Sequence, residues 1–123
     1  MADERLFSRA EAEALLPRLR PLLEGIREAG DRMAAASRER GGNGGGGVAR
    51  EVMALGDELR AALLEVEELG IVLRDTSTGL VDFPALRDGA PVYLCWRLGE
   101  EGVGWWHPRD TGFAGRSEID WEA

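Results

Sequence analysis

The sequence predicts an α+β fold in which a long antiparallel helical hairpin precedes a small tryptophan-rich antiparallel β-sheet. Apolar residues recur every three or four positions through residues 9–69, which is the period of an amphipathic helix. After Gly70 the apolar residues form short, β-branched or alternating runs that are typical of strands. A chain of 123 residues fits one domain. We therefore expect a single domain over residues 1–123, with the hairpin at 8–69 and the sheet and a C-terminal loop at 70–123.

The first helix has a clear start signal and two internal breaks. Ser8 and Glu11 have the spacing of a capping box, which predicts a helix from about residue 9. Pro17 and Pro21 each lack an amide donor and clash with the preceding turn. We expect a short leading helix over residues 9–15, a kink at Pro17, and a long helix that continues to about residue 40.

The two helical arms have matching apolar stripes. Their spacing of three and four residues is that of a coiled coil, and the stripes consist of Leu15, Leu19, Leu22, Ile26, Ala29, Met33 and Ala36 in the first arm and Val48, Val52, Leu55, Leu59, Ala62, Val66 and Leu69 in the second. The glycine-rich segment 41–47 is expected to be the turn between them, because glycine opposes helix formation. Gly70 is expected to end the second helix as a left-handed cap, with Ile71 touching Val66.

Four leucines widen these stripes beyond what two helices can cover. They are Leu16, Leu23, Leu63 and Leu64. Either the sheet covers them or a second chain does, as in a four-helix bundle. We expect a homodimer that forms through the hairpin.

Short strands are expected at residues 71–73, 80–83, 91–98, 103–107 and 117–121, and Pro84 and Pro108 are expected to end the second and fourth. A symmetric four-residue loop at 99–102 would pair Leu98 with Val103, Trp96 with Trp105, and Leu94 with His107. In that register Arg97 lies diagonal to Trp106, where a cation–π contact is possible.

Composition excludes several classes of protein. The chain has 15 basic and 23 acidic residues, for a net charge of −8, and its arginines are dispersed among acids. Nucleic-acid binding requires clustered basic residues, so we do not expect it. No apolar run approaches the length of about 18 residues that a membrane span needs. The acidic start of the chain does not resemble a signal peptide, and we expect a cytoplasmic protein. A single cysteine, Cys95, excludes an internal disulfide framework and a multi-cysteine zinc site.

His107 and Asp82 are the main candidates for chemistry. His107 is the only histidine, so it either carries any imidazole chemistry or caps the edge of an aromatic core. Asp82 interrupts an apolar strand. It faces solvent if Val81 and Phe83 point inward; if it is buried it needs a partner, because an unpaired buried carboxylate is costly. The available partners are Arg97, Arg116 and His107, and such a pair would either be structural or form part of a site.

Three further residues have alternative interpretations. Glu100 could join Asp82 and His107 in a metal site, although no tight spacing signature supports one. Cys95 is either a nucleophile that works with His107 or a packed, inert thiol. Arg116 either clamps an anion or forms an ordinary salt bridge. The candidate ligand-binding residues are therefore Asp82, Trp96, Arg97, Trp106, His107 and Arg116, the candidate metal ligands are Asp82, Glu100 and His107, and no cofactor is implied.

Several sequence stretches together resemble domain-of-unknown-function family 2203, an uncharacterised bacterial family. These stretches are Ala10-Glu11-Ala12 through Leu15-Leu16-Pro17, Gly79-Leu80-Val81-Asp82-Phe83-Pro84, Tyr93-Leu94-Cys95-Trp96-Arg97-Leu98-Gly99-Glu100, Trp106-His107 and Gly112-Phe113-Ala114-Gly115-Arg116. The resemblance covers nearly the whole chain. It implies a bacterial cytosolic protein, and it supplies no reaction, cofactor or catalytic residue.

Two functions are compatible with these observations. The first is a non-enzymatic dimeric scaffold or interaction module, with the hairpin as its interface and the aromatic sheet as its binding face. The second is a small-molecule or metal-binding protein, with hydrolysis among its conceivable activities. Its site would lie on the sheet, consist of Asp82, Glu100, His107 and Arg116, and accept a small anionic ligand. Convergence of Asp82, His107 and Arg116 on a pocket beside Trp96 or Trp106 would favour the second function.

Overall fold

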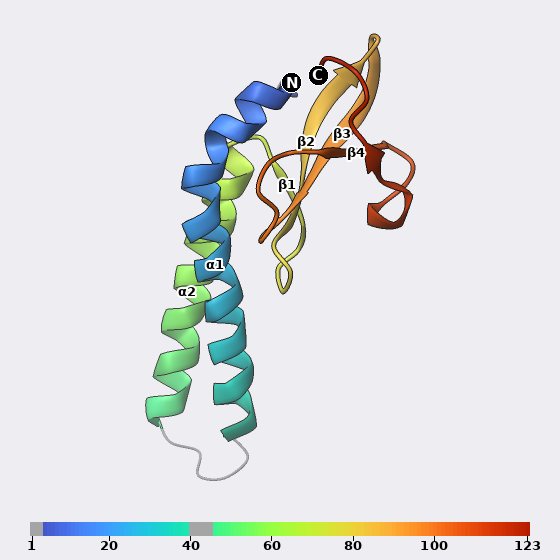
Figure 1. The fold of residues 1–123 in the computed structure, drawn as a ribbon. Helices are drawn as coiled ribbons and strands as arrows, with labels where there is room; N and C mark the ends of the chain where they lie inside the picture. The colour runs from blue at the N-terminus through green and yellow to red at the C-terminus, as the bar shows by residue number, and fades with distance from the viewer. Residues whose placement is uncertain (1–3, 40–45) are drawn as a thin grey trace.

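A computed structural model describes residues 4–39 and 46–123. Its helices are α1 (Arg9–Glu39), α2 (Gly46–Glu68) and the short 3₁₀ helix η1 (Phe113–Gly115). Its strands are β1 (Val72–Asp75), β2 (Leu80–Arg87), β3 (Ala90–Arg97), β4 (Trp105–Pro108) and β5 (Ser117–Glu118). The predicted order of a helical hairpin followed by an antiparallel sheet is confirmed (Figure 1).

The capping box at the start of α1 is confirmed. The Ser8 amide donates to Glu11 Oε1 at 2.9 Å, and the Glu11 amide donates to Ser8 Oγ at 3.1 Å. The prediction of a separate leading helix over residues 9–15 is wrong, because α1 runs from Arg9 through both prolines without a break. Pro17 and Pro21 are both exposed, so water can bind the carbonyl groups that lose their helical donor.

The two ends of α2 differ in how well the sequence predicts them. Gly46 and Gly47 were expected in the turn, but they form the first turn of α2. The remainder of the expected turn, residues 41–45, lies outside the described residues. The predicted cap at Gly70 is confirmed: its φ is +84°, its amide donates to the Glu67 carbonyl, and the Ile71 amide donates to the Val66 carbonyl. These are the two hydrogen bonds of a Schellman motif.

The five strands form one antiparallel sheet in the order β1-β2-β3-β4-β5. The prediction that Pro84 ends its strand is wrong, because β2 continues to Arg87. Pro84 is tolerated because its carbonyl group accepts a hydrogen bond from the Phe7 amide at 2.7 Å. The polar groups of the Pro84 backbone therefore point away from β3, to the side of β2 where β1 has already ended. No neighbouring strand requires a hydrogen-bond donor from Pro84 on that side. Within the described residues, neither helix is long and apolar enough to cross a membrane.

The predicted register between β3 and β4 is wrong by one residue. The structure pairs Tyr93 with His107, Leu94 with Trp106 and Cys95 with Trp105. The connection between the strands spans residues 98–104 and is longer than the expected four-residue loop. A shift of one residue moves every side chain of β4 to the other face. Trp106 therefore shares a face with Leu94, whereas Trp105 and His107 share the face of Cys95.

The inner face of the sheet packs against the helices and forms the core. Every second side chain of β2 and β3 points toward the helices and is buried. These residues are Val81, Phe83, Ala85, Val92, Leu94 and Trp96. They pack with residues of α1 that include Leu16 and Leu23, so the sheet covers two of the four surplus leucines. Leu63 is partly buried, and Leu64 remains 50% exposed.

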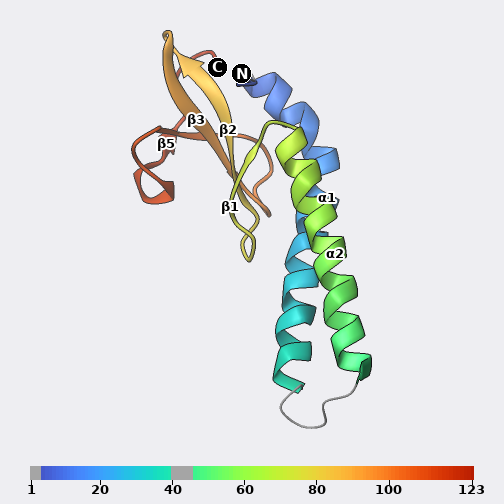
Figure 2. The ribbon, with the colours of Figure 1, turned by 180° about the vertical axis from the view of Figure 1, so that it is seen from behind.

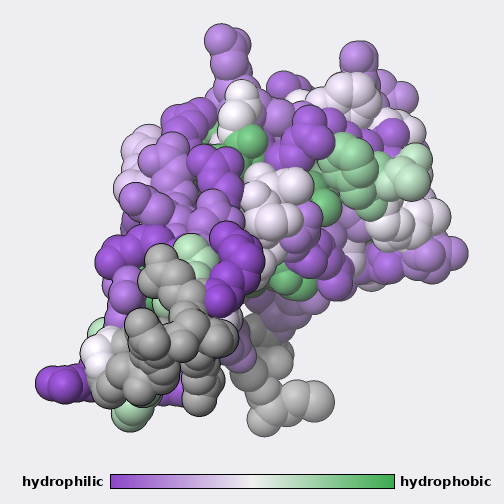
Figure 3. Space-filling view, turned by 90° about the horizontal axis from the view of Figure 1, so that it is seen from below, coloured by the Kyte–Doolittle hydropathy of each residue, from purple (hydrophilic) through white to green (hydrophobic). Residues whose placement is uncertain are grey.

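The sheet lies beside only one end of the hairpin. Figure 2 shows it against the start of α1 and the end of α2, while the rest of the hairpin extends beyond it. Seen from below, the surface is mostly hydrophilic and its apolar areas are small and separate (Figure 3).

Candidate functional site

A buried aspartate–histidine pair lies at the centre of the outer face of the sheet. Asp82 on β2 and His107 on β4 are each only 2% exposed. Asp82 Oδ1 lies 2.9 Å from His107 Nε2. The sequence left open whether Asp82 is solvated or buried. The structure shows that it is buried even though Val81 and Phe83 point inward, because both faces of β2 are covered.

Both ring nitrogens of His107 face oxygen acceptors. Nε2 faces the Asp82 carboxylate, and Nδ1 lies 2.8 Å from the carbonyl oxygen of Pro108. A neutral imidazole has one donor and one acceptor nitrogen, so a neutral ring donates to only one of these two oxygens at a time.

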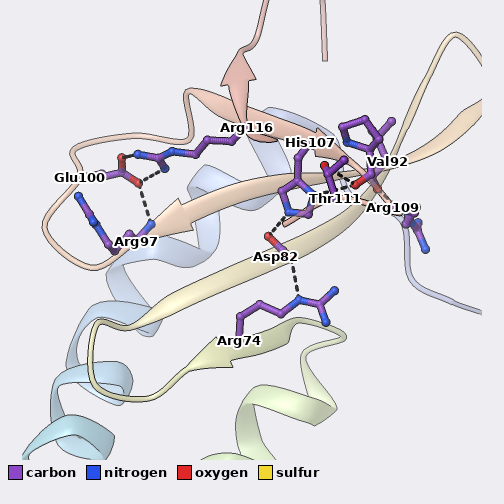
Figure 4. A network of polar contacts seen from close by, with 10 residues as sticks. Arg74, Asp82, Val92, Arg97, Glu100, His107, Arg109, Thr111 and Arg116 are labelled. Atoms are coloured by element: carbon purple, nitrogen blue, oxygen red, sulfur yellow. Dashed lines mark hydrogen bonds and ion pairs between the residues drawn. The ribbon is translucent and has the colours of Figure 1, made fainter. Parts of the chain in front are cut away.

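Arg74 is the second partner of Asp82, and sequence reasoning missed it. Its Nε donates to Asp82 Oδ2 at 2.8 Å (Figure 4). Arg74 lies at a β-bulge, since Leu73 pairs with Val81 and Asp75 pairs with Leu80. A bulge redirects a side chain, and neither its position nor its effect can be inferred from residues 71–75 alone. Asp82 raises the pKa of Arg74 further through this hydrogen bond.

Cys95 lies beside the ion pair. It is directly opposite Asp82 across β2 and β3 and is 1% exposed. The donor atoms of Asp82, Cys95 and His107 all lie within 4.8 Å of one another. Burial, followed by the nearby Asp82 carboxylate, raises the pKa of the Cys95 thiol to about 12. A nucleophilic cysteine needs a lowered pKa, so the structure favours the inert-thiol interpretation over a Cys–His catalytic pair.

Glu100 and Arg116 form a separate cluster away from Asp82. Arg116 donates to both carboxylate oxygens of Glu100, at 3.1 and 2.8 Å, and its guanidinium lies 4.5 Å from the centre of the Trp105 ring. Glu100 Oε1 also accepts from the Arg97 amide. The Arg97 guanidinium lies over Phe113 and not over Trp106. The structure therefore does not bring Glu100 to the Asp82–His107 pair, and Arg116 approaches it only through Cys95, with which its guanidinium interacts.

The two candidate tryptophans lie on the inner face, opposite this pair. Trp96 is fully buried, and its indole Nε1 donates to the Glu100 carbonyl. Trp106 packs edge-on against Trp121, with the Arg87 guanidinium over both rings. The expected convergence of Asp82, His107 and Arg116 on a pocket beside a tryptophan is not observed.

A pocket of about 270 Å³ opens over Asp82 instead. The residues that follow β4 turn back across the outer face, and the pocket is lined by Arg74, Leu80, Asp82, Arg109, Asp110, Thr111, Gly112 and Phe113. Arg74 and Arg109 both lie over the Tyr93 ring, at 5.0 and 4.3 Å from its centre. Tyr93 and Arg109 were not predicted as site residues. The predicted register paired His107 with Leu94, whereas the structure pairs it with Tyr93.

Arg109 ties three parts of the chain together at the edge of this pocket. It donates through Nε to the Val92 carbonyl and through its two terminal nitrogens to both carboxylate oxygens of Glu4, at 2.9 Å each. The hydrogen bond from Arg109 lowers the pKa of Glu4.

Comparison with known proteins identifies the family and no activity. No significant match was found to a curated protein or to a solved structure. The family described as "Uncharacterized conserved protein (DUF2203)" matches residues 5–119, which is nearly the whole chain. The matched range includes Asp82, His107 and every residue that lines the pocket, which together we call the outer-face site. The chain therefore belongs to the DUF2203 family.

Proposed function

We propose that this protein binds a small anion, such as the phosphate or carboxylate group of a small molecule, in the pocket over Asp82. The supporting observation is that two guanidinium groups, those of Arg74 and Arg109, line one small pocket. Asp82 and Asp110 also line it, and Asp82 is already bound by Arg74 and His107.

The geometry of Arg74 suits this role. It binds Asp82 through Nε, and its terminal nitrogens point away from the carboxylate (Figure 4). The planar guanidinium can bind a phosphate or carboxylate through two parallel hydrogen bonds. Arg109 lines the same pocket, where it adds a second guanidinium that Glu4 balances. We place this activity in the bacterial cytoplasm, the location that the family resemblance implies.

The test is a thermal-shift screen with inorganic phosphate, small phosphomonoesters and di- and tricarboxylates, each compared with chloride at equal ionic strength. We expect at least one of these anions to raise the melting temperature of the wild type and to have little effect on Arg74→Gln. Arg60→Gln is the matched control, because Arg60 is exposed on α2, pairs with Asp57 and does not line the pocket. Phosphate stabilises many proteins by exclusion from their surface. Equal shifts in the wild type and Arg74→Gln would therefore refute the proposal.

A second candidate function is the homodimeric scaffold, with the hairpin as its interface. It is supported by two exposed apolar side chains on α2, Met53 at 69% and Leu64 at 50% exposure. They are eleven positions apart, which places them on one side of a helix. Sedimentation equilibrium at micromolar concentration tests this function. We expect a dimer that Leu64→Asp dissociates, and a wild-type monomer of 13.4 kDa would contradict it.

A further inference from the structure

Three potential metal ligands meet on the outer face of the sheet. Asp82, Cys95 and His107 come from the neighbouring strands β2, β3 and β4. Their carboxylate, thiol and imidazole donor atoms lie within 4.8 Å of one another, and all three residues are at most 2% exposed. This is the only such group of ligands within residues 4–39 and 46–123. Sheet strands hold side chains more rigidly than loops do, which favours a preorganised site.

The register of the strands explains why these three side chains converge. Asp82 is paired with Cys95 across β2 and β3, and His107 is paired with Tyr93, two residues from Cys95. Residues two apart on a strand point to the same face, so Cys95 and Tyr93 both face outward. His107 therefore lies diagonal to Cys95 and reaches Asp82 across β3.

The surrounding hydrogen bonds orient two of these ligands. The Pro108 carbonyl accepts from His107 Nδ1, which leaves Nε2 as the nitrogen that faces Asp82 and Cys95. Arg74 Nε binds Asp82 Oδ2, which leaves Oδ1 facing His107. Metal-binding histidines commonly donate their second ring nitrogen to a backbone carbonyl, and ligating carboxylates are themselves hydrogen-bonded. Both features are present here.

We propose that Asp82 Oδ1, Cys95 Sγ and His107 Nε2 bind one divalent zinc-type cation. The cation lies between Nε2 and Oδ1 and accepts the lone pair of Nε2, while the proton on Nδ1 stays with the Pro108 carbonyl. It also displaces the thiol proton of Cys95, which passes to the buffer. Zinc bonds of about 2.0–2.2 Å at a tetrahedral angle separate two such donors by about 3.3 Å. The present Nε2–Oδ1 distance of 2.9 Å has to widen by only a few tenths of an ångström.

The types of donor atom select the metal. A set of one sulfur, one nitrogen and one oxygen suits zinc and its neighbours, whereas magnesium and calcium prefer oxygen ligands. Coordination deprotonates a thiol even where burial alone keeps it neutral. The carboxylate and the thiolate together balance the two charges of the cation.

Three protein ligands leave a fourth position for water or for another ligand. Asp82 also lines the pocket of about 270 Å³, so this position is on the side from which a small molecule can enter. The metal site does not depend on the proposed anion binding, because Arg74 and Arg109 would attract an anion with or without the cation.

Cobalt(II) is the most informative probe, because a cobalt–thiolate bond produces a charge-transfer band in the near ultraviolet. Cys95 is the only cysteine of the chain, so a thiolate band can come from no other residue. We would strip the full-length protein with a chelator, titrate it with cobalt chloride, and then displace cobalt with zinc. We expect one equivalent of cobalt, a thiolate band that saturates at that ratio, and loss of the band when zinc is added.

Substitutions locate the site within the protein. We expect Cys95→Ser to abolish the thiolate band and to weaken cobalt binding at least about tenfold, and Asp82→Asn to weaken binding to a similar degree. Asp120→Asn is the matched control, since Asp120 is an exposed acid that pairs with Arg87 and is not part of this group, and we expect it to bind cobalt like the wild type. Circular dichroism would establish that each variant is folded. The wild-type spectrum is decisive even if Cys95→Ser does not fold.

The absence of a thiolate band in the wild type, or cobalt binding that Asp82→Asn leaves unchanged, would overturn the metal proposal. Anion binding would be measured separately on the chelator-treated protein. A phosphate shift that depends on Arg74 without a thiolate band would refute only the metal site, and the converse result would refute only the anion site.

Discussion

Asp82 shows how one residue connects the stability of this sheet with its chemistry. It receives hydrogen bonds from Arg74 and His107, and it is almost completely buried. Removing one partner of a buried ion pair leaves the other charge uncompensated, and this is strongly destabilising. The same carboxylate also lines the pocket. Its substitution is therefore expected to affect both folding and binding.

We predict that Asp82→Asn lowers the free energy of unfolding by about 3 kcal/mol, because Arg74 loses its counter-charge and the buried contact with His107 is weakened. Urea denaturation followed by tryptophan fluorescence measures this change. Asp88→Asn is the control: Asp88 is exposed and has a φ of +51°, a conformation that asparagine tolerates well. We expect the control to differ from the wild type by less than about 0.5 kcal/mol. Equal stability of Asp82→Asn and wild type would contradict the importance of the pair.

Sequence reasoning identified part of the outer-face site. Asp82 is conspicuous as an acid in an apolar strand, and His107 is the only histidine, so both can be selected without a structure. Arg74, Tyr93 and Arg109 have no such signal. Arg74 reaches Asp82 through a bulge, and Tyr93 joins His107 only in the observed register. Both features depend on contacts between strands, which a linear pattern does not contain.

At the scale of elements, the start of α1 and the end of α2 were predictable because their signals are local. The capping box at Ser8 and the Schellman motif at Gly70 each involve residues within one or two turns. The β3–β4 register was not predictable from loop length. In the loop between β3 and β4, the Trp96 indole donates to the Glu100 carbonyl, and Glu100 Oε1 accepts from the Arg97 amide. These side-chain contacts stabilise a longer loop than the symmetric four-residue turn.

We predict that Ser8→Ala destabilises the protein by about 1 kcal/mol, because the Glu11 amide loses its acceptor. Thermal unfolding monitored by circular dichroism measures the change. Ser8→Asp is the matched variant, since aspartate is also a good N-cap residue, and it should keep most of the stability. If Ser8→Ala and Ser8→Asp had equal stabilities, the cap would make no contribution.

Two glycines in tight turns allow a prediction that separates backbone strain from steric clash. Gly79 and Gly89 have φ values of +69° and +81°. A Cβ atom at Gly79 would lie 2.7 Å from Leu98 Cβ, whereas one at Gly89 would meet nothing within 4 Å. We expect Gly89→Ala to cost about 1 kcal/mol from the left-handed backbone alone, and Gly79→Ala to cost at least about 2 kcal/mol. Chemical denaturation of both variants is the measurement, and equal losses would show that Leu98 relaxes freely.

At the scale of the whole molecule, arginine side chains join segments that are far apart in sequence. Arg109 connects Glu4, β3 and the segment after β4, and Arg116 connects the segment after η1 to Glu100. Such contacts attach the end of the chain to the sheet and cover its outer face. The fold class was predictable because it follows from periodicity, whereas this coverage depends on individual long-range ion pairs.

The Glu4–Arg109 pair predicts a contribution to acid sensitivity. Its hydrogen bond lowers the pKa of Glu4 in the folded state. The stabilisation is therefore fully present above the unfolded value of about 4.3 and is lost as the pH falls through the lower, folded-state pKa. We expect the wild type to lose more stability than Glu4→Gln between neutral pH and about pH 3. Urea midpoints measured across this range would show parallel curves if the pair made no difference.

The alternation of side chains along β2 and β3 has a consequence for how this family can diversify. Inward residues such as Phe83 and Leu94 hold the sheet on the hairpin, whereas the outward residues Leu80 and Asp82 of β2 line the pocket. Apart from Asp82, which contributes to both, packing and ligand contacts thus fall on different positions. Pocket residues outside the core can therefore be exchanged while the scaffold is kept, which makes this sheet a suitable starting point for directed evolution of new binding specificities.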